Sequence, residues 1–423
     1  MNFLNFLATN NHTVGVTPVN AGDLTGIGWV IGWIFDLFSN FYGAVALGVI
    51  VFTLALKTLV LPLDIYSRVK TKKQSLLMER MRPQMEKLQK QYANDKNMYS
   101  QKVMELQKAN GYNPLGACLP MIVSLVVFMI VLTSFSTYSN YAVMRDYSQM
   151  AKAYNDSVAV YVIEENAENP EQRFLNKTEA EGVYTVDFEK FAQHYKPVYD
   201  EAHKNDVDGD GVSTFVEFNI QEYLDKSEQD KWETVSDYIE INARKSAAEW
   251  YRTHNNGTSF GWIGNLWYPD SMLNKEVPDF SKFQSTTVRS GITVSEIDYN
   301  KVTQDLTAEK ETYNGYFVLI VLSIGFMFLQ QFITMRAQKA ANELSSVDGS
   351  AAKTNKYMMI IMPIIFGLFS FMYSAAFSVY MITNTLYGLA STLIINKIVT
   401  VRYKNKEIVT GGRPSNKAKR LKK

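Results

Sequence analysis

The run Tyr42–Leu63, YGAVALGVIVFTLALKTLVLPL, decides the fold class of this chain. It is apolar apart from Lys57 and two threonines, and its length is the roughly 20 residues that a helix needs to cross a bilayer. A cation at the centre of such a helix costs roughly 2.5–3.5 kcal/mol, and somewhat less near an end. Two interpretations stay open: Lys57 has a function inside the membrane, or its long stem reaches the headgroups near Pro62.

The apolar residues of the 423-residue chain are gathered into five such stretches. The average composition hides this, because 20% of the residues are charged and the formal net charge is only +1. Each of the other four stretches also approaches the length of a membrane span. They are Leu115–Phe135, Tyr316–Ile333, Tyr357–Tyr373 and Phe377–Ile395. The sequence therefore predicts an all-α polytopic membrane protein with five transmembrane helices.

Basic residues set the predicted orientation in the membrane. The connection 64–112 and the tail 397–423 are rich in lysine and arginine, whereas the long connection 137–312 is acidic. By the positive-inside rule the two basic segments lie in the cytoplasm and the N-terminus lies outside. An odd number of spans agrees with this orientation.

Patterns outside the spans complete the predicted domain organisation. Trp29, Trp33 and Leu37 repeat every four residues, as in an amphipathic helix that lies in the interface. Methionines recur at helical spacing among charged residues on both sides of a turn at 93–96, which predicts a cytoplasmic helical hairpin. This methionine row packs the hairpin's own core or contacts a partner or lipid. FGWIGNLWYPD, over 260–270, predicts an aromatic belt at the outer interface.

The predicted boundaries follow from these patterns. The segments are an extracellular N-terminal segment (1–26), an interfacial helix (27–40), five spans (41–63, 113–136, 313–335, 357–374 and 376–396), a cytoplasmic hairpin (64–112), a mainly helical extracellular insertion (137–312), a cytoplasmic loop (336–356) and a basic cytoplasmic tail (397–423).

NDVDGDGVSTFVEF, over 205–218, has the spacing of a calcium loop of EF-hand or dockerin type. Its oxygen ligands suit Ca²⁺, with an affinity of order 10⁻⁴–10⁻³ M for an extracellular module. Ser213 departs from the aliphatic residue usual at position eight, and an acidic solvated turn is the alternative. The predicted ligands are Asp206, Asp208, Asp210, the carbonyl of Val212, Thr214 through a water, and Glu217.

Three further stretches carry a resemblance to a known family. MERMRPQMEKLQKQY (78–92), NPLGACLPM (113–121) and KYMMIIMPIIFGLFSF (356–371) are similar to the YidC/Oxa/Alb-type membrane protein insertases. This resemblance covers roughly residues 27–135 and 260–398. It implies five helices around a hydrophilic groove that is open to the cytoplasm and to lipid, in a bacterial plasma membrane.

The resemblance gives Lys57 a place in that groove. The family usually has an arginine at this position, shortly before a leucine–proline pair. Lysine keeps the positive charge but loses the forked guanidinium geometry. In the second span, Ser124 and Val126 stand where the family often has glutamine and proline. The chain therefore resembles a divergent member with an altered groove lining.

Polar side chains within the spans are the candidates for that lining. Thr53 and Lys57 lie one helical turn apart on the first span. Each of the other candidates could instead make a helix–helix hydrogen bond, which is worth about 0.6 kcal/mol on average. Those candidates are Ser124, Gln330, Gln331, Thr383 and Asn384.

The resemblance implies a non-enzymatic insertase without a cofactor or a small-molecule substrate. Lys57 would attract acidic residues in the tail of a nascent membrane protein, while the client's apolar helix enters the lipid bilayer. The tail after Arg402 faces the ribosome or anionic lipid, or serves topology alone. Cooperation with the Sec translocon stays open. A transporter or channel with Lys57 as an anion site is the alternative, although the internal repeats usual in transporters are not seen.

Overall fold

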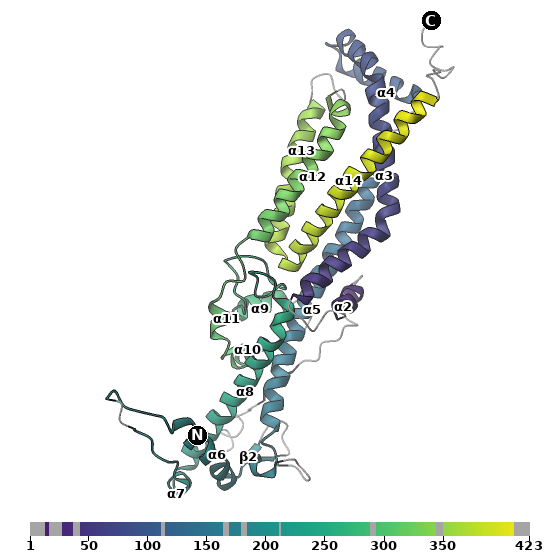
Figure 1. Cartoon of the computed structure of the whole chain (residues 1–423). Helices are drawn as coiled ribbons and strands as arrows, with labels where there is room; N and C mark the ends of the chain where they lie inside the picture. The colour runs from purple at the N-terminus through teal and green to yellow at the C-terminus, as the bar shows by residue number, and fades with distance from the viewer. Residues whose placement is uncertain are drawn as a thin grey trace. The chain divides into compact units, whose positions relative to one another are not determined.

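The computed structural model describes residues 13–16, 28–36, 43–110, 115–163, 169–178, 184–210, 213–287, 293–343 and 350–409. The chain forms two compact units. We call them the membrane unit (21–139, 256–276 and 313–423) and the insertion unit (1–20, 140–255 and 277–312). Most of the described residues are helical (Figure 1).

The membrane unit is built from long helices. They are α2 (Gly28–Asp36), α3 (Ala44–Gln91), α4 (Lys96–Ala109), the first part of α5 (Leu115–Ala159), α12 (Val318–Glu343), α13 (Ser350–Met372) and α14 (Ala375–Val409). In Figure 1, α14 runs along α3, and α12 packs against α13, α14 and α3. Aromatic rings pack between the helices. The ring centre of Phe135 on α5 lies 5.8 Å from that of Phe52 on α3 and 5.4 Å from that of Tyr380 on α14.

Four helices in the described part of the chain are long and apolar enough to cross a membrane. Their spans are Ala44–Tyr66, Val126–Ala159, Val318–Arg336 and Ala375–Ile395. The predicted fourth span, 357–374, falls almost entirely on α13, whose shorter apolar part is Pro363–Met372. The five-span count therefore stays a prediction, while the mainly helical, multi-pass architecture is found.

The small helix α2 lies against α3. Ile31 is fully buried, whereas Trp29 and Trp33 are each 63% exposed. The tryptophans therefore face away from the packed side of the helix. Leu37, the third residue of the predicted stripe, lies outside the described residues.

The methionines of the 64–112 connection pack its own core. The second half of α3 turns back through 92–95 into α4. Met81 and Met85 are buried against Tyr99 and Val103 of α4, with Leu88 packed beside them. Of the two interpretations of the methionine row, the structure favours a hairpin core for these two residues, because their side chains have almost no exposed surface.

Helices of very different lengths and one two-stranded sheet make up the described part of the insertion unit. Beside the end of α5, its elements are η2 (Pro170–Gln172), β1 (Leu175–Lys177), β2 (Tyr184–Val186), α6 (Phe188–His203), α7 (Ile220–Leu224), α8 (Glu228–Thr258, to Asn255), α9 (Phe280–Thr287), α10 (Glu296–Thr303) and α11 (Thr307–Glu311). β1 and β2 are antiparallel, with Asn176 opposite Thr185. Phe174, Phe191 and Tyr238 form an aromatic core around them.

Several helices continue past the predicted boundaries. α5 runs on to Ala159, although the second span was expected to end at 136. No proline or glycine interrupts this stretch, and Tyr147, Ala151 and Tyr154 are buried at helical spacing. α12 and α13 likewise take up much of the predicted loop 336–356, and α14 extends into the basic tail. The ends of apolar runs therefore do not mark the ends of these helices.

Candidate functional site

Lys57 lies within α3, in the part of the helix that is apolar enough to span a membrane. Its side chain is half-buried. One turn earlier, Thr53 is 0% exposed, and its hydroxyl donates to the carbonyl of Val49 at 2.6 Å. The hydroxyl of Thr53 therefore donates its hydrogen bond within its own helix, as threonines in membrane spans commonly do.

Gln330 packs at the contact between α12 and α14. Its side chain is half-buried, and a Cβ built on Gly388 would lie only 2.6 Å from its Nε2. Gly388 thus lets the amide of Gln330 approach the backbone of α14. This placement favours a helix–helix contact for Gln330, one of the two roles expected from the sequence. Gln331, the next residue, is also half-buried.

The candidates on α14 follow the same pattern. The hydroxyl of Thr383 donates to the carbonyl of Val379 at 2.9 Å, and Asn384 is half-buried beside it in the sequence. The side chain of Ser124 lies outside the described residues. The structure therefore brings together α3, α12 and α14, the three helices that carry the other six candidates.

A carboxylate that the sequence analysis passed over ties two parts of the membrane unit together. Asp270 is 0% exposed. Its Oδ1 accepts from the backbone N–H of Tyr316 at 2.8 Å and of Phe317 at 3.1 Å, and its Oδ2 accepts from Leu319 at 2.6 Å. These N–H groups stand at the beginning of α12, where no carbonyl of the helix can accept them. Asp270 is therefore the N-terminal cap of a span.

The segment around Asp270, which we call the 259–276 loop, also bonds to the chain just before α12 and to the beginning of α14. Asn265 and Asn314 bond reciprocally, through Asn265 N–H to Oδ1 of Asn314 at 2.7 Å and Nδ2 of Asn314 to the Asn265 carbonyl at 2.8 Å. The carbonyls of Leu266 and Tyr268 accept from Ala376 and Ala375, at the beginning of α14. One loop thus fixes where α12 and α14 begin.

This arrangement corrects the expected aromatic belt over 260–270. Trp262 is 40% exposed, as a belt residue would be. Trp267 is 2% exposed and Tyr268 is 3% exposed. Trp267 packs edge-on against Tyr138, with the ring centres 5.2 Å apart. Half of the aromatic segment is therefore core, because its backbone bonds to α14 draw the rings inward. A pattern of aromatic residues alone does not distinguish these two placements.

The predicted calcium loop is closed by its backbone. The N–H of Thr214 donates to the carbonyl of Asp206 at 2.9 Å, and the N–H of Asp210 donates to Oδ1 of Asp208 at 3.0 Å. Glu217 instead lies 3.4 Å from Nζ of Lys196 on α6. In the described part of the chain, no three acidic, histidine or cysteine side chains gather as a metal site. Val212 lies outside the described residues.

Comparison with known proteins gives the family. The family model described as 60Kd inner membrane protein matches residues 37–163 and 251–403, more than half of the chain. The first matched segment includes α3 and α5, and the second includes the 259–276 loop, α12 and α13. The residues between them, 164–250, lie outside the match and belong to the insertion unit.

Similar curated proteins carry the name membrane protein insertase YidC. One from Leptospira interrogans is 34% identical over 111 residues, 26% of this chain and 17% of that protein. One from Fusobacterium nucleatum is 33% identical over 97 residues, which are 23% of this chain and 45% of that protein. One from Oceanobacillus iheyensis is 35% identical over 122 residues, which are 28% of this chain and 42% of that protein.

The alignments thus span less than half of the length of these relatives. No solved structure matches the chain. The family match nevertheless covers α3, the hairpin, α5, α12, α13 and α14 up to residue 403, which carry Lys57 and the other candidate groove residues. This multi-pass membrane protein therefore belongs to the 60Kd inner membrane protein family, that of YidC and Oxa1.

Proposed function

We propose that this protein is a membrane protein insertase, which moves nascent membrane proteins from the cytoplasmic side into the bilayer. The observation that carries the proposal is a half-buried lysine, Lys57, inside a membrane-spanning helix of a protein of this family. The relatives' names support the same activity. The proposed work needs no bond chemistry, so no catalytic residue and no cofactor is assigned to it.

Lys57 is the proposed attracting group. A charge within a span is costly, and such charges commonly line a water-filled path. We propose that Lys57, Gln331 and Asn384 line a hydrophilic groove between α3, α12 and α14, which pack on one another. The ammonium of Lys57 attracts carboxylates in a client's tail, and the groove shortens the hydrocarbon path of that tail. The client's apolar helix then partitions into lipid, which supplies the driving free energy.

An insertion assay with reconstituted vesicles tests this proposal. We expect small single-span clients with acidic tails to insert when the protein is present, and Lys57→Ala to slow them while Lys57→Arg retains activity. The matched control is Lys87→Ala, which removes an exposed lysine from the same helix in the hairpin. A solute flux through the vesicles without any client insertion would favour the alternative, a transporter or channel.

Partners follow from the same proposal. The clients are nascent membrane proteins, and the surrounding partner is the lipid bilayer. The basic tail 397–423 offers lysines and arginines to ribosomal RNA or to anionic lipid, because both carry phosphate. Co-sedimentation with ribosomes of the protein with and without its tail distinguishes ribosome binding from lipid binding. Action beside the Sec translocon is a further expectation, which depletion of the translocon in the insertion assay would test.

Calcium binding by the 206–217 loop is a separate proposal. The closed backbone and the three aspartates suit a weak Ca²⁺ site that braces the insertion unit. For Glu217 to serve as the last ligand, it has to leave Lys196. Calorimetric titration of the full chain with Ca²⁺ tests this. We expect a heat of binding in the wild type and none in the double variant Asp208→Ala/Glu217→Ala. Identical titrations of the two proteins would contradict the site.

A further inference from the structure

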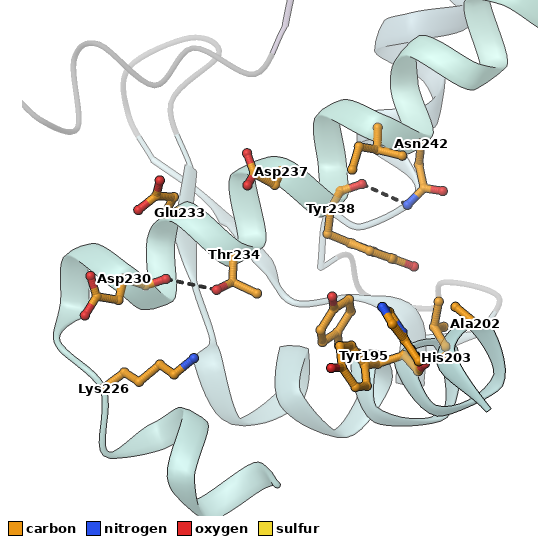
Figure 2. A pocket seen from close by; sticks show the side chains of 13 residues that line it. Tyr195, Ala202, His203, Lys226, Asp230, Glu233, Thr234, Asp237, Tyr238 and Asn242 are labelled. Atoms are coloured by element: carbon orange, nitrogen blue, oxygen red, sulfur yellow. Dashed lines mark hydrogen bonds between the residues drawn. The ribbon is translucent and has the colours of Figure 1, made fainter. Parts of the chain in front are cut away.

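An open hollow of about 640 Å³ lies between α6 and α8 of the insertion unit (Figure 2). Its volume falls within the roughly 300–1,000 Å³ of sites that hold small ligands or short peptide segments. All of its lining residues belong to 195–242, within the part of the chain that lies outside the family match. The hollow, which we call the α6–α8 groove, is thus a feature of the insertion unit alone.

Carboxylates form one wall of the groove. Asp230, Glu233 and Asp237 lie on α8 at intervals of three and four residues, so they share one side of the helix, and all three are exposed. At a rise of 1.5 Å per residue, this stripe is about 10 Å long. Within the described part of the chain, none of the three carboxylates forms an ion pair. Lys226 is the single lysine in the lining, so the groove is anionic.

Aromatic rings form the opposite wall. Tyr195, Tyr199 and His203 follow one another at four-residue intervals along α6, and each is half-buried. The rings of Tyr199 and His203 stack with their centres 4.0 Å apart, and Tyr195 meets Tyr238 of α8 edge-on at 5.4 Å. Figure 2 shows Tyr195 and His203 beneath Tyr238. Such flat rings suit proline rings and the stems of cationic side chains.

We propose that the α6–α8 groove binds a basic polypeptide segment in the polyproline II conformation, with lysine or arginine at positions i and i+3. This helix has three residues per turn and a rise of about 3.1 Å, so residues i and i+3 point to one side, about 9 Å apart. That spacing matches Asp230 and Asp237. The prolines between the two cations lie on the tyrosines. The proposal stands independently of the insertase activity, because it uses no residue of the spans.

Calorimetry on the full chain in lipid nanodiscs tests the proposal. The probe is acetyl-Lys-Pro-Pro-Lys-amide, and its glutamate counterpart is the control peptide. We expect binding of the lysine peptide alone. Asp230→Asn combined with Asp237→Asn should weaken it between about 2-fold and 30-fold, as expected for two exposed ion pairs. Glu249→Gln, which neutralises an exposed carboxylate of α8 outside the groove, should leave the affinity unchanged.

A second variant tests the aromatic wall. Tyr199→Leu keeps an apolar side chain but removes the ring, so we expect weaker binding of the same peptide at unchanged net charge. Several outcomes would overturn the proposal: no binding of the lysine peptide to the wild type, equal binding by the wild type and the double asparagine variant, or binding of spermidine without binding of the peptide. Circular dichroism of each variant confirms that its helices are intact.

Discussion

Polar side chains of the membrane unit differ in how far along the chain their hydrogen-bond partners lie, and that difference decides which of them the sequence can identify. Thr53 and Thr383 donate to carbonyls four residues earlier, a bond that any threonine in a helix can make. Asp270 bonds instead to residues 46 to 49 positions away. Its role could not be predicted from sequence, because no local pattern links it to the beginning of α12. Lys57 was predictable, because a charge in an apolar run is itself a local signal.

Loss of the Asp270 carboxylate should destabilise the membrane unit. In Asp270→Ala, three N–H groups at the beginning of α12, one of them buried and two partly buried, lose their acceptor, and the expected loss is about 1.5–3 kcal/mol in the free energy of unfolding, as for hydrogen bonds to a charged group. Thermal unfolding in detergent measures it. As a control, Asp156→Asn breaks an exposed ion pair with Lys152 and should cost less than about 1 kcal/mol. Equal costs for the two variants would contradict the capping role.

His194 should make the insertion unit less stable in mild acid. Burial lowers the pKa of His194 from its ordinary value of 6.5, while Glu171 raises it less strongly. The unfolded chain therefore binds this proton more readily than the folded chain. The stability that the neutral imidazole contributes is present above about pH 6.5 and is lost as the pH falls through the lowered pKa.

The variant His194→Gln tests this pH dependence, because glutamine can bond to Tyr238 without titrating. We expect its melting temperature to fall less than that of the wild type between pH 7.5 and pH 5.5. His254→Gln, which removes an exposed histidine, should keep the wild-type difference. If His194→Gln keeps that difference as well, another group is responsible.

At the scale of helices, contact between α12 and α14 depends on the absence of a side chain at one position. Gly388→Leu drives a side chain into the space of the Gln330 amide, which a Cβ would already approach to 2.6 Å. Overpacking of this kind costs about 1–3 kcal/mol. We expect Gly388→Leu to lower the melting temperature in detergent and Gln330→Ala to restore part of the loss in the double variant.

Gly325→Leu on α12 is the matched control, because no atom lies within 4 Å of the position of its Cβ apart from its chain neighbours and the adjacent backbone of its own helix. It should leave the melting temperature nearly unchanged. Purely additive effects of Gly388→Leu and Gln330→Ala would show that these two residues do not pack together.

Helix lengths were harder to predict than helix positions. The apolar runs located α3, α5, α12, α13 and α14, because a buried or lipid-facing helix has to be apolar. They did not show where α3 and α5 end, since these helices leave the apolar region without a break and continue among charged or amphipathic residues to Gln91 and Ala159. A helix continues until a residue or a contact stops it, whether or not its surroundings change.

At the scale of the whole chain, the membrane unit explains why α13 should cross the membrane, as the fourth of five spans. α12 ends at Glu343 and α13 begins at Ser350, and this connection reaches at most about 25 Å, less than the roughly 30 Å of the hydrocarbon core. α13 therefore starts on the side where α12 ends. Its other end meets Ala375 and Ala376, which bond to the 259–276 loop, and the same loop caps the beginning of α12 through Asp270. α13 thus returns to the side where α12 began.

Labelling of single cysteines on intact cells tests this crossing. After Cys118→Ser removes the one native thiol, an impermeant maleimide is applied to Glu228→Cys in the insertion unit, Lys87→Cys in the hairpin and Lys397→Cys after the last span. With five spans, we expect labelling of Glu228→Cys alone, and of the other two only after permeabilisation, because the four crossings between the hairpin and the tail place both on the same side. With four spans, Lys397→Cys would be labelled together with Glu228→Cys. That outcome would mean that α13 lies along the membrane surface, and it would place the basic tail where neither a ribosome nor a cytoplasmic lipid could meet it.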